Sequence, residues 1–123
     1  MSNYKNYFKE TQDWETLEYD WGFVTYEICN DCVFIHHAYV DEKNRDNGVG
    51  KKLMFEIAKV AKEFDKPMLR CGIDTRSKNH NHNLLRYLHN GAKVWSLDHP
   101  FIYIYLTLDD VYKNSKYRDL KWD

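Results

Sequence analysis

The feature that most constrains the fold is a helix-period pattern that begins directly after two closely spaced glycines, Gly48 and Gly50. Apolar residues then recur at steps of three and four, with charged residues between them, as in an amphipathic helix with one buried face. Pro67 marks the end of the pattern, because proline cannot continue a helix. The sequence therefore predicts a long central helix over about residues 49–64. Its apolar positions are Val49, Leu53, Ile57, Val60, Ala61 and Phe64.

Strands are predicted on both sides of this helix. Residues 21–28 and 32–40 are rich in β-branched and aromatic side chains, which favour strands. The turn-forming pair Asn30-Asp31 separates the two runs, so we expect them to form an antiparallel hairpin. Residues 68–73 predict a further strand directly after Pro67.

The C-terminal third of the chain predicts a helix followed by a second hairpin. Residues 83–90 are expected to form a short helix that Gly91 closes. Residues 92–97 and 101–108 predict a closing pair of strands, with His99-Pro100 between them.

The N-terminal residues 3–20 mix aromatic with charged side chains, and we expect one or two short helices there that pack on the sheet. The order of elements indicates an α+β protein with a mixed sheet. A length of 123 residues leaves room for one hydrophobic core, so residues 1–123 are expected to form a single domain.

Composition and charge exclude several classes of function. The chain is 43% hydrophobic and 16% aromatic, as a folded domain should be, and its formal net charge is −1 with both signs interspersed. Such a charge distribution argues against general nucleic-acid binding. No apolar run approaches the roughly 18 residues that a membrane span needs, and the start of the sequence lacks a signal peptide's apolar stretch. We therefore expect a cytoplasmic protein that does not bind membranes.

Cysteine and histidine pairs offer the alternative of a metal site. Cys29 and Cys32 form a C-x-x-C, but the chain has three cysteines and no second pair, so we interpret the two as reduced thiols beside a hairpin turn. His80 and His82 lie in a polar stretch without a nearby cysteine or carboxylate, which favours a solvated loop. No metal is expected.

The segment in front of the central helix has the properties of an anion site. The first amides of a helix have no partner within it, and the helix dipole is positive there. Glycine at positions 48 and 50 lets a ligand reach the backbone, and Arg45 and Lys51 add positive charge that Asp46 partly offsets. The alternative is a first helical turn with permissive glycines. The predicted pyrophosphate loop comprises Arg45, Asp46, Asn47, Gly48, Val49, Gly50 and Lys51.

The run from Phe34 to Met54 resembles the acetyl-CoA motif of the GNAT N-acetyltransferases. In that family a strand ends five residues before the Arg or Gln of R-x-x-G-x-G/A, as Val40 precedes Arg45 here. The resemblance extends over about residues 22–108 and includes a tyrosine, Tyr87, at the family's spacing before Gly91. It implies a mixed, mostly antiparallel sheet with a central helix after the acetyl-CoA loop.

The chain departs from the family pattern at three positions of the second motif. Ala92 stands where phenylalanine is usual, and Arg86 stands where an apolar residue is usual. His80 occupies the place of a frequent asparagine.

The resemblance also implies roles for individual groups. Backbone groups of Ala38, Tyr39 and Val40 would pair with the pantetheine arm, and the Val40 N–H would polarise the thioester carbonyl. The amides of residues 47–51 would hold the pyrophosphate. Tyr87 would be the general acid that protonates the departing thiolate, with a half-buried helix tyrosine as the alternative.

His36 is the candidate general base. Strand alternation is expected to place it on the same face as Ala38 and Val40, and some family members carry a histidine here in a proton path. The alternatives are a histidine that is only hydrogen-bonded within the sheet, and Glu27 acting as the base through a water molecule.

The resemblance thus implies an acetyl-CoA-dependent N-acetyltransferase that acts on a primary amine, either a small amine or a protein lysine or N-terminus. The alternative is a non-catalytic module on the same fold that binds CoA or a protein partner. Fold and donor do not fix the acceptor, which would lie among the N-terminal segment, residues 74–83 and the last hairpin. The aromatic terminal strands also suggest pairing with a second copy.

Overall fold

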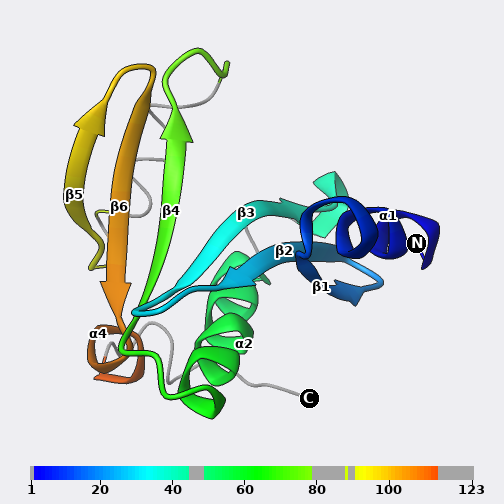
Figure 1. Ribbon diagram of the computed structural model, residues 1–123, viewed down its shortest axis with the longest axis horizontal. Coiled ribbons are helices and arrows are strands. Elements are labelled where there is room, and N and C mark those ends of the chain that lie inside the picture. Colours follow the sequence, from blue (N-terminus) through cyan, green and yellow to red (C-terminus); the bar gives the residue numbers. More distant parts are fainter. Residues whose placement is uncertain (1, 45–48, 79–87, 89–90, 114–123) are drawn as a thin grey trace.

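The structure, a computed structural model, describes residues 2–44, 49–78, 88 and 91–113, and in these ranges six strands form one sheet in the order β1-β2-β3-β4-β6-β5. Neighbouring strands run antiparallel except β3 and β4, which are parallel. The fold is therefore the predicted α+β arrangement with a mixed, mostly antiparallel sheet (Figure 1). The elements are α1 (Ser2–Gln12), β1 (Glu15–Tyr19), β2 (Gly22–Ile28), β3 (Val33–Val40), η1 (Glu42–Asn44), α2 (Val49–Glu63), β4 (Met68–Asp74), β5 (Lys93–Asp98), β6 (Phe101–Thr107) and α4 (Leu108–Lys113).

The N-terminal segment, for which only helices are predicted, contains a helix and a strand. Helix α1 ends at Gln12, Asp13 follows with a φ of 59°, and the chain then forms strand β1, which pairs with β2. Within β1, Leu17 packs against the core while the neighbouring Thr16 is buried on the other face. The two glutamates of the strand, Glu15 and Glu18, conceal this period of two in the sequence.

The hairpin of β2 and β3 turns at Asn30-Asp31, as predicted. The backbone N–H of Cys29 donates to the carbonyl oxygen of Cys32 at 2.9 Å and closes a two-residue loop. Both thiols are free, and burial raises the pKa of Cys32 to about 11. The C-x-x-C is therefore part of a hairpin turn.

Helix α2 covers one face of the sheet and packs against β2, β3 and β4. Its residues Leu53, Ile57 and Ala61 are buried, as the pattern predicts. Phe64 is not a core residue: its side chain is 53% exposed, because the helix ends at Glu63. The chain turns away there, with the N–H of Lys66 donating to the carbonyl oxygen of Ala61 at 2.8 Å.

The sheet opens between its two parallel strands. The ladder of β3 and β4 comprises three pairs, from Val33↔Leu69 to Ile35↔Cys71. Beyond the last pair the strands diverge, and Figure 1 shows the sheet as two wings, β1-β2-β3 and β4-β6-β5. An apolar pocket lies at the base of this opening, with Ile35, Cys71 and Met54 of α2 in its lining.

The C-terminal hairpin and the glycine before it are also as predicted. Strands β5 and β6 pair antiparallel. Gly91 has a φ of 100° and its N–H donates to the carbonyl oxygen of Leu88 at 3.1 Å, which fits the predicted end of a helix. The other residues of the predicted helix, including Tyr87, and the histidines at 80 and 82 lie outside the described residues. Strand β5 forms the sheet edge, where Leu97 is 74% exposed, and pairing with a second copy stays a prediction.

Helices long and apolar enough to cross a membrane are not found among the described residues. In the same part of the chain, no three His, Cys, Asp or Glu side chains come together as they would around a metal ion.

Candidate functional site

An irregular step in the ladder of β2 and β3 sets the geometry of the candidate site. Tyr26 pairs with Ile35, but Thr25 pairs with His37, so His36 is an extra residue in β3. Side chains of β3 before His36 and after it therefore do not follow one continuous alternation between the two faces of the sheet. Ile35 and Ala38 both lie on the face of α2, since their partners Tyr26 and Val24 belong to the core.

The prediction that His36 shares a face with Ala38 and Val40 is wrong for this reason. The His36 ring lies on the opposite face of the sheet, where it contacts Phe34 at 4.9 Å between ring centroids. Val40 packs against the core on the side of α2. Simple alternation failed because it counts residues along a regular strand, and the bulge adds one.

His36 and Glu27 form a direct polar contact. Nε2 of His36 lies 2.9 Å from Oε1 of Glu27, which comes from the neighbouring strand β2. An ionised carboxylate only accepts hydrogen bonds, so Nε2 carries the proton and the lone pair of the neutral ring is on Nδ1. The side chains are 20% and 45% exposed, respectively, so solvent and substrate can reach the pair.

Trp14 fixes the orientation of the His36 ring. The two rings stack at 3.7 Å between centroids and within 13° of parallel. Trp14 is in this position because the left-handed Asp13 ends α1 and directs the chain back across the sheet. Beneath it, the hydroxyls of Thr16 and Thr25 pair at 3.5 Å and satisfy one another in a buried site.

His37 points to the same side of the sheet as Thr25, its partner on β2. Its ring lies 5.8 Å from the Trp14 ring. Burial, and secondarily the neighbouring His36, lowers the pKa of His37 below the usual histidine value.

The last residues of β3 are held by a close approach of β2. Gly22 pairs with Val40, and a Cβ at position 22 would collide with the carbonyl oxygen of Tyr39. The Tyr39 ring is 47% exposed and stacks on Phe23, while the short side chain of Ala38 is exposed. The backbone of the predicted pantetheine-binding residues is therefore positioned by a glycine that no other residue could replace without a shift.

The predicted pyrophosphate loop is described only in part. Val49, Gly50 and Lys51 form the first turn of α2, so the glycine motif does lie at the N-terminus of the central helix. Arg45, Asp46, Asn47 and Gly48 lie outside the described residues. Anion binding by this segment stays a prediction.

Sequence reasoning did not find Trp14 as a site residue. The only local signal was its position after a predicted helix, and its contact with His36 spans 22 positions along the chain. Tyr103 and Gly72, which lie on the same face as His36, were missed as well, because neither belongs to a recognisable sequence motif.

A family model described as the acetyltransferase (GNAT) family matches residues 12–89. A search of the curated proteins found no match.

Solved structures of acetyltransferases share the fold of this chain. PaiA N-acetyltransferase from Thermoplasma acidophilum in complex with coenzyme A has a TM-score of 0.62 at 20% identity, over 71% of this chain and 53% of that one. A GNAT family acetyltransferase from Elizabethkingia anophelis with acetyl-CoA bound has a TM-score of 0.64 at 15% identity, over 84% and 82% of the two chains. The acetyltransferase of Bacillus subtilis in complex with CoA gives 0.62 at 18% identity, over 84% and 83%.

This chain thus spans about half the length of the Thermoplasma protein and most of the other two. At these identities the likeness demonstrates the fold. The family model matches well over half of the sequence, and the chain belongs to the GNAT acetyltransferase family.

Proposed function

We propose that the chain transfers an acetyl group from acetyl-CoA to a primary amine by direct attack of the amine on the thioester. The observation that carries this proposal is the contact of His36 with Glu27 at the point where β3 leaves β4. A neutral imidazole that is held by a carboxylate and is one-fifth exposed, at the point where two strands diverge, is a suitable proton acceptor.

The divergence of β3 and β4 supports a position for the donor in this proposal. The β3–β4 ladder stops at Ile35↔Cys71, and β3 continues for five residues to Val40 along the opening. In the proposal, the pantetheine arm lies along Ala38, Tyr39 and Val40, and the Val40 N–H polarises the thioester carbonyl. The pyrophosphate lies at residues 45–51, where α2 begins with Val49 and Gly50.

The proton path follows from the tautomer of His36. The acceptor's ammonium group first loses a proton to Nδ1 of His36, while Nε2–H remains bound to Glu27. The amine nitrogen then attacks the carbonyl carbon and a C–N bond forms, the nitrogen gives its second proton to solvent, and the C–S bond breaks. The departing thiolate takes a proton from Tyr87, which solvent replaces. Glu27 acts as a positioning residue in this scheme.

A screen of primary amines with acetyl-CoA tests the function. Free thiol should appear together with an equal amount of acetylated amine, and only when both substrates are present. Binding of CoA without thiol release for any amine would instead support the non-catalytic module.

A further inference from the structure

A continuous row of aromatic rings crosses the sheet face opposite α2. The Trp14 ring stacks on His36, and His36 contacts Phe34 at 4.9 Å between centroids. Phe34 continues to Tyr103 at 6.4 Å, and Tyr103 to Phe101 at 5.9 Å. The row connects the α1–β1 junction to β6 and passes over β3 and β4 on the way.

Gly72 is the reason that the row is continuous. It pairs with Tyr103, and a Cβ at position 72 would lie 3.0 Å from Cε1 and 3.3 Å from Cδ1 of the Tyr103 ring. The ring therefore lies directly over the backbone of β4 and reaches toward Phe34 on β3. An added Cβ would require the ring to move by a few tenths of an ångström, and a longer side chain would require a larger displacement.

The row crosses the sheet at the start of the opening. Phe34 pairs with Arg70 in the parallel ladder, and Gly72 is the first residue of β4 after the last pair, Ile35↔Cys71. Rings from both wings, Phe34 and Tyr103, thus meet where the strands begin to diverge.

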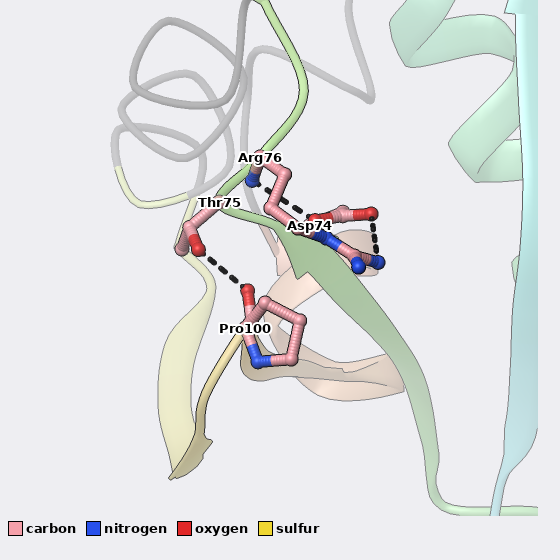
Figure 2. Close-up of polar contacts among 4 residues, drawn as sticks. All are labelled: Asp74, Thr75, Arg76 and Pro100. Carbon is pink, nitrogen blue, oxygen red and sulfur yellow. Dashed lines mark hydrogen bonds and ion pairs between the residues drawn. The ribbon is translucent and has the colours of Figure 1, made fainter.

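Hydrogen bonds join β4 to β6 beside the far end of the row, and Figure 2 shows the one from the Thr75 hydroxyl to the carbonyl oxygen of Pro100. The backbone N–H and the hydroxyl of Thr75 both donate to the carbonyl oxygen of Pro100, at 2.8 and 2.7 Å, and this joins the end of β4 to the start of β6. The guanidinium of Arg76 pairs with Asp74 at 3.0 Å and lies 5.9 Å from the Phe101 ring. Phe101, the first residue of β6, is therefore held opposite Asp74 at the end of β4.

Polar groups lie at the two ends of the row. The Glu27–His36 pair lies next to the Trp14 end of the row, and the Arg76–Asp74 pair lies at the Phe101 end. Arg70, which is next to Phe34, points to Asp31 at 3.2 Å and stacks over Trp95 at 3.7 Å. The middle of the row, Phe34 and Tyr103, presents ring surfaces that are half-buried and suited to an apolar ligand.

We propose that this row binds the acceptor, and that the acceptor is a small primary amine on a flat, apolar body. The amino group lies at His36, near the Glu27 carboxylate, and the body lies against Phe34 and Tyr103. A peptide is less suitable, because its backbone amides would be desolvated against the Phe34 ring, which offers no hydrogen bond. The inference rests on the proposed acetyl transfer and adds the acceptor class.

The test compares two amines with acetyl-CoA at saturation. Benzylamine has a flat ring, and n-butylamine has a flexible chain without one. Wild-type protein should have a higher kcat/KM for benzylamine. Tyr103→Leu should raise the KM for benzylamine about three- to tenfold, the loss expected for one aromatic contact, and the KM for n-butylamine by less than about twofold. The KM for acetyl-CoA should not change.

Two further variants separate the ring contact from other effects. Tyr103→Phe keeps the ring and should retain the wild-type KM for benzylamine. Tyr105→Leu is the matched control, because Tyr105 lies two residues along β6 and its ring contacts Trp95 instead. If Tyr103→Leu does not fold, Gly72→Leu, whose side chain needs more room than a single Cβ, displaces the same ring and should raise the same KM.

The outcomes distinguish the two proposals. Equal kcat/KM values for both amines, an unchanged benzylamine KM in Tyr103→Leu and in the Gly72 variant, or a clear preference for a lysine peptide would overturn the acceptor class and leave acetyl transfer intact. Tight acetyl-CoA binding without acetylation of any amine would overturn the proposed function, and the acceptor site with it.

Discussion

Nε2 of His36 and Oε1 of Glu27 lie 2.9 Å apart across the irregular step of the β2–β3 ladder. The extra residue in β3 places the imidazole on the face opposite α2, while Ala38 and Val40 remain on the face of α2. The proposed base and the proposed donor-binding backbone therefore approach the sheet opening from different sides. A donor and an acceptor could meet there without competing for the same surface.

Glu27→Gln should lower kcat about tenfold and leave the KM for acetyl-CoA unchanged. The amide can still hydrogen-bond to His36, but it no longer fixes the proton on Nε2. The His36 ring therefore has its lone pair on Nδ1 in only a fraction of the protein molecules. Steady-state kinetics on one amine would measure the effect, with Glu15→Gln on β1 as a surface control. A loss in Glu27→Gln equal to or larger than that in His36→Gln would indicate that Glu27 is the base.

Gly50→Trp should abolish stabilisation by acetyl-CoA. Position 50 is in the first turn of α2, and an indole there would occupy the proposed pyrophosphate site. Thermal unfolding with and without acetyl-CoA measures the effect, because a ligand that binds only the folded state raises Tm. Lys59→Trp, on an exposed position later in the same helix, is the control. An undiminished Tm shift in Gly50→Trp would refute the loop assignment.

Gly22→Ala should destabilise the fold by about 2–4 kcal/mol, since the new Cβ would collide with the Tyr39 carbonyl oxygen and β2 would have to move away from β3. Urea unfolding would measure the free-energy difference. Asp20→Ala, in the same turn but exposed, should cost much less. A Gly22→Ala variant as stable as wild type would mean that the close approach is absent in solution.

We expect His37 to contribute to a loss of stability in acid. Its lowered pKa means that the unfolded chain binds a proton more readily than the folded chain. The contribution of neutral His37 to the free energy of unfolding is therefore fully present above the ordinary histidine pKa of about 6.5. This contribution is lost as the pH falls through the lower pKa that His37 has in the folded chain. His37→Gln should reduce the loss of Tm between pH 7.5 and pH 5.5. An identical loss of Tm in both proteins would exclude a contribution from His37.

Local patterns predicted the elements that depend on nearby residues. The period of α2, its end before Pro67 and the turn at Asn30-Asp31 each involve residues only a few positions apart. Gly91 was predicted as a helix end, and it has the positive φ that this position requires.

The remaining features depend on contacts between distant residues. Strand β1 forms because it pairs with β2, although its two glutamates do not suggest a strand. The bulge at His36 depends on the register between β2 and β3, and the Trp14 stack depends on where α1 ends. Propensity and periodicity describe one segment at a time, so they could identify His36 as a candidate but not the face on which it lies.

The pH dependence of acetyl transfer by wild type and His36→Gln tests the central claim most directly. Only a neutral imidazole can accept the acceptor's proton, so acid should lower kcat for wild type beyond the effect of the amine's own ionisation, which is common to both proteins. Glutamine keeps polarity but cannot titrate. We predict that His36→Gln lowers kcat by about a hundredfold or more and removes the acid limb that belongs to the enzyme. The same rate and the same profile in both proteins would contradict the assignment of His36 as the base.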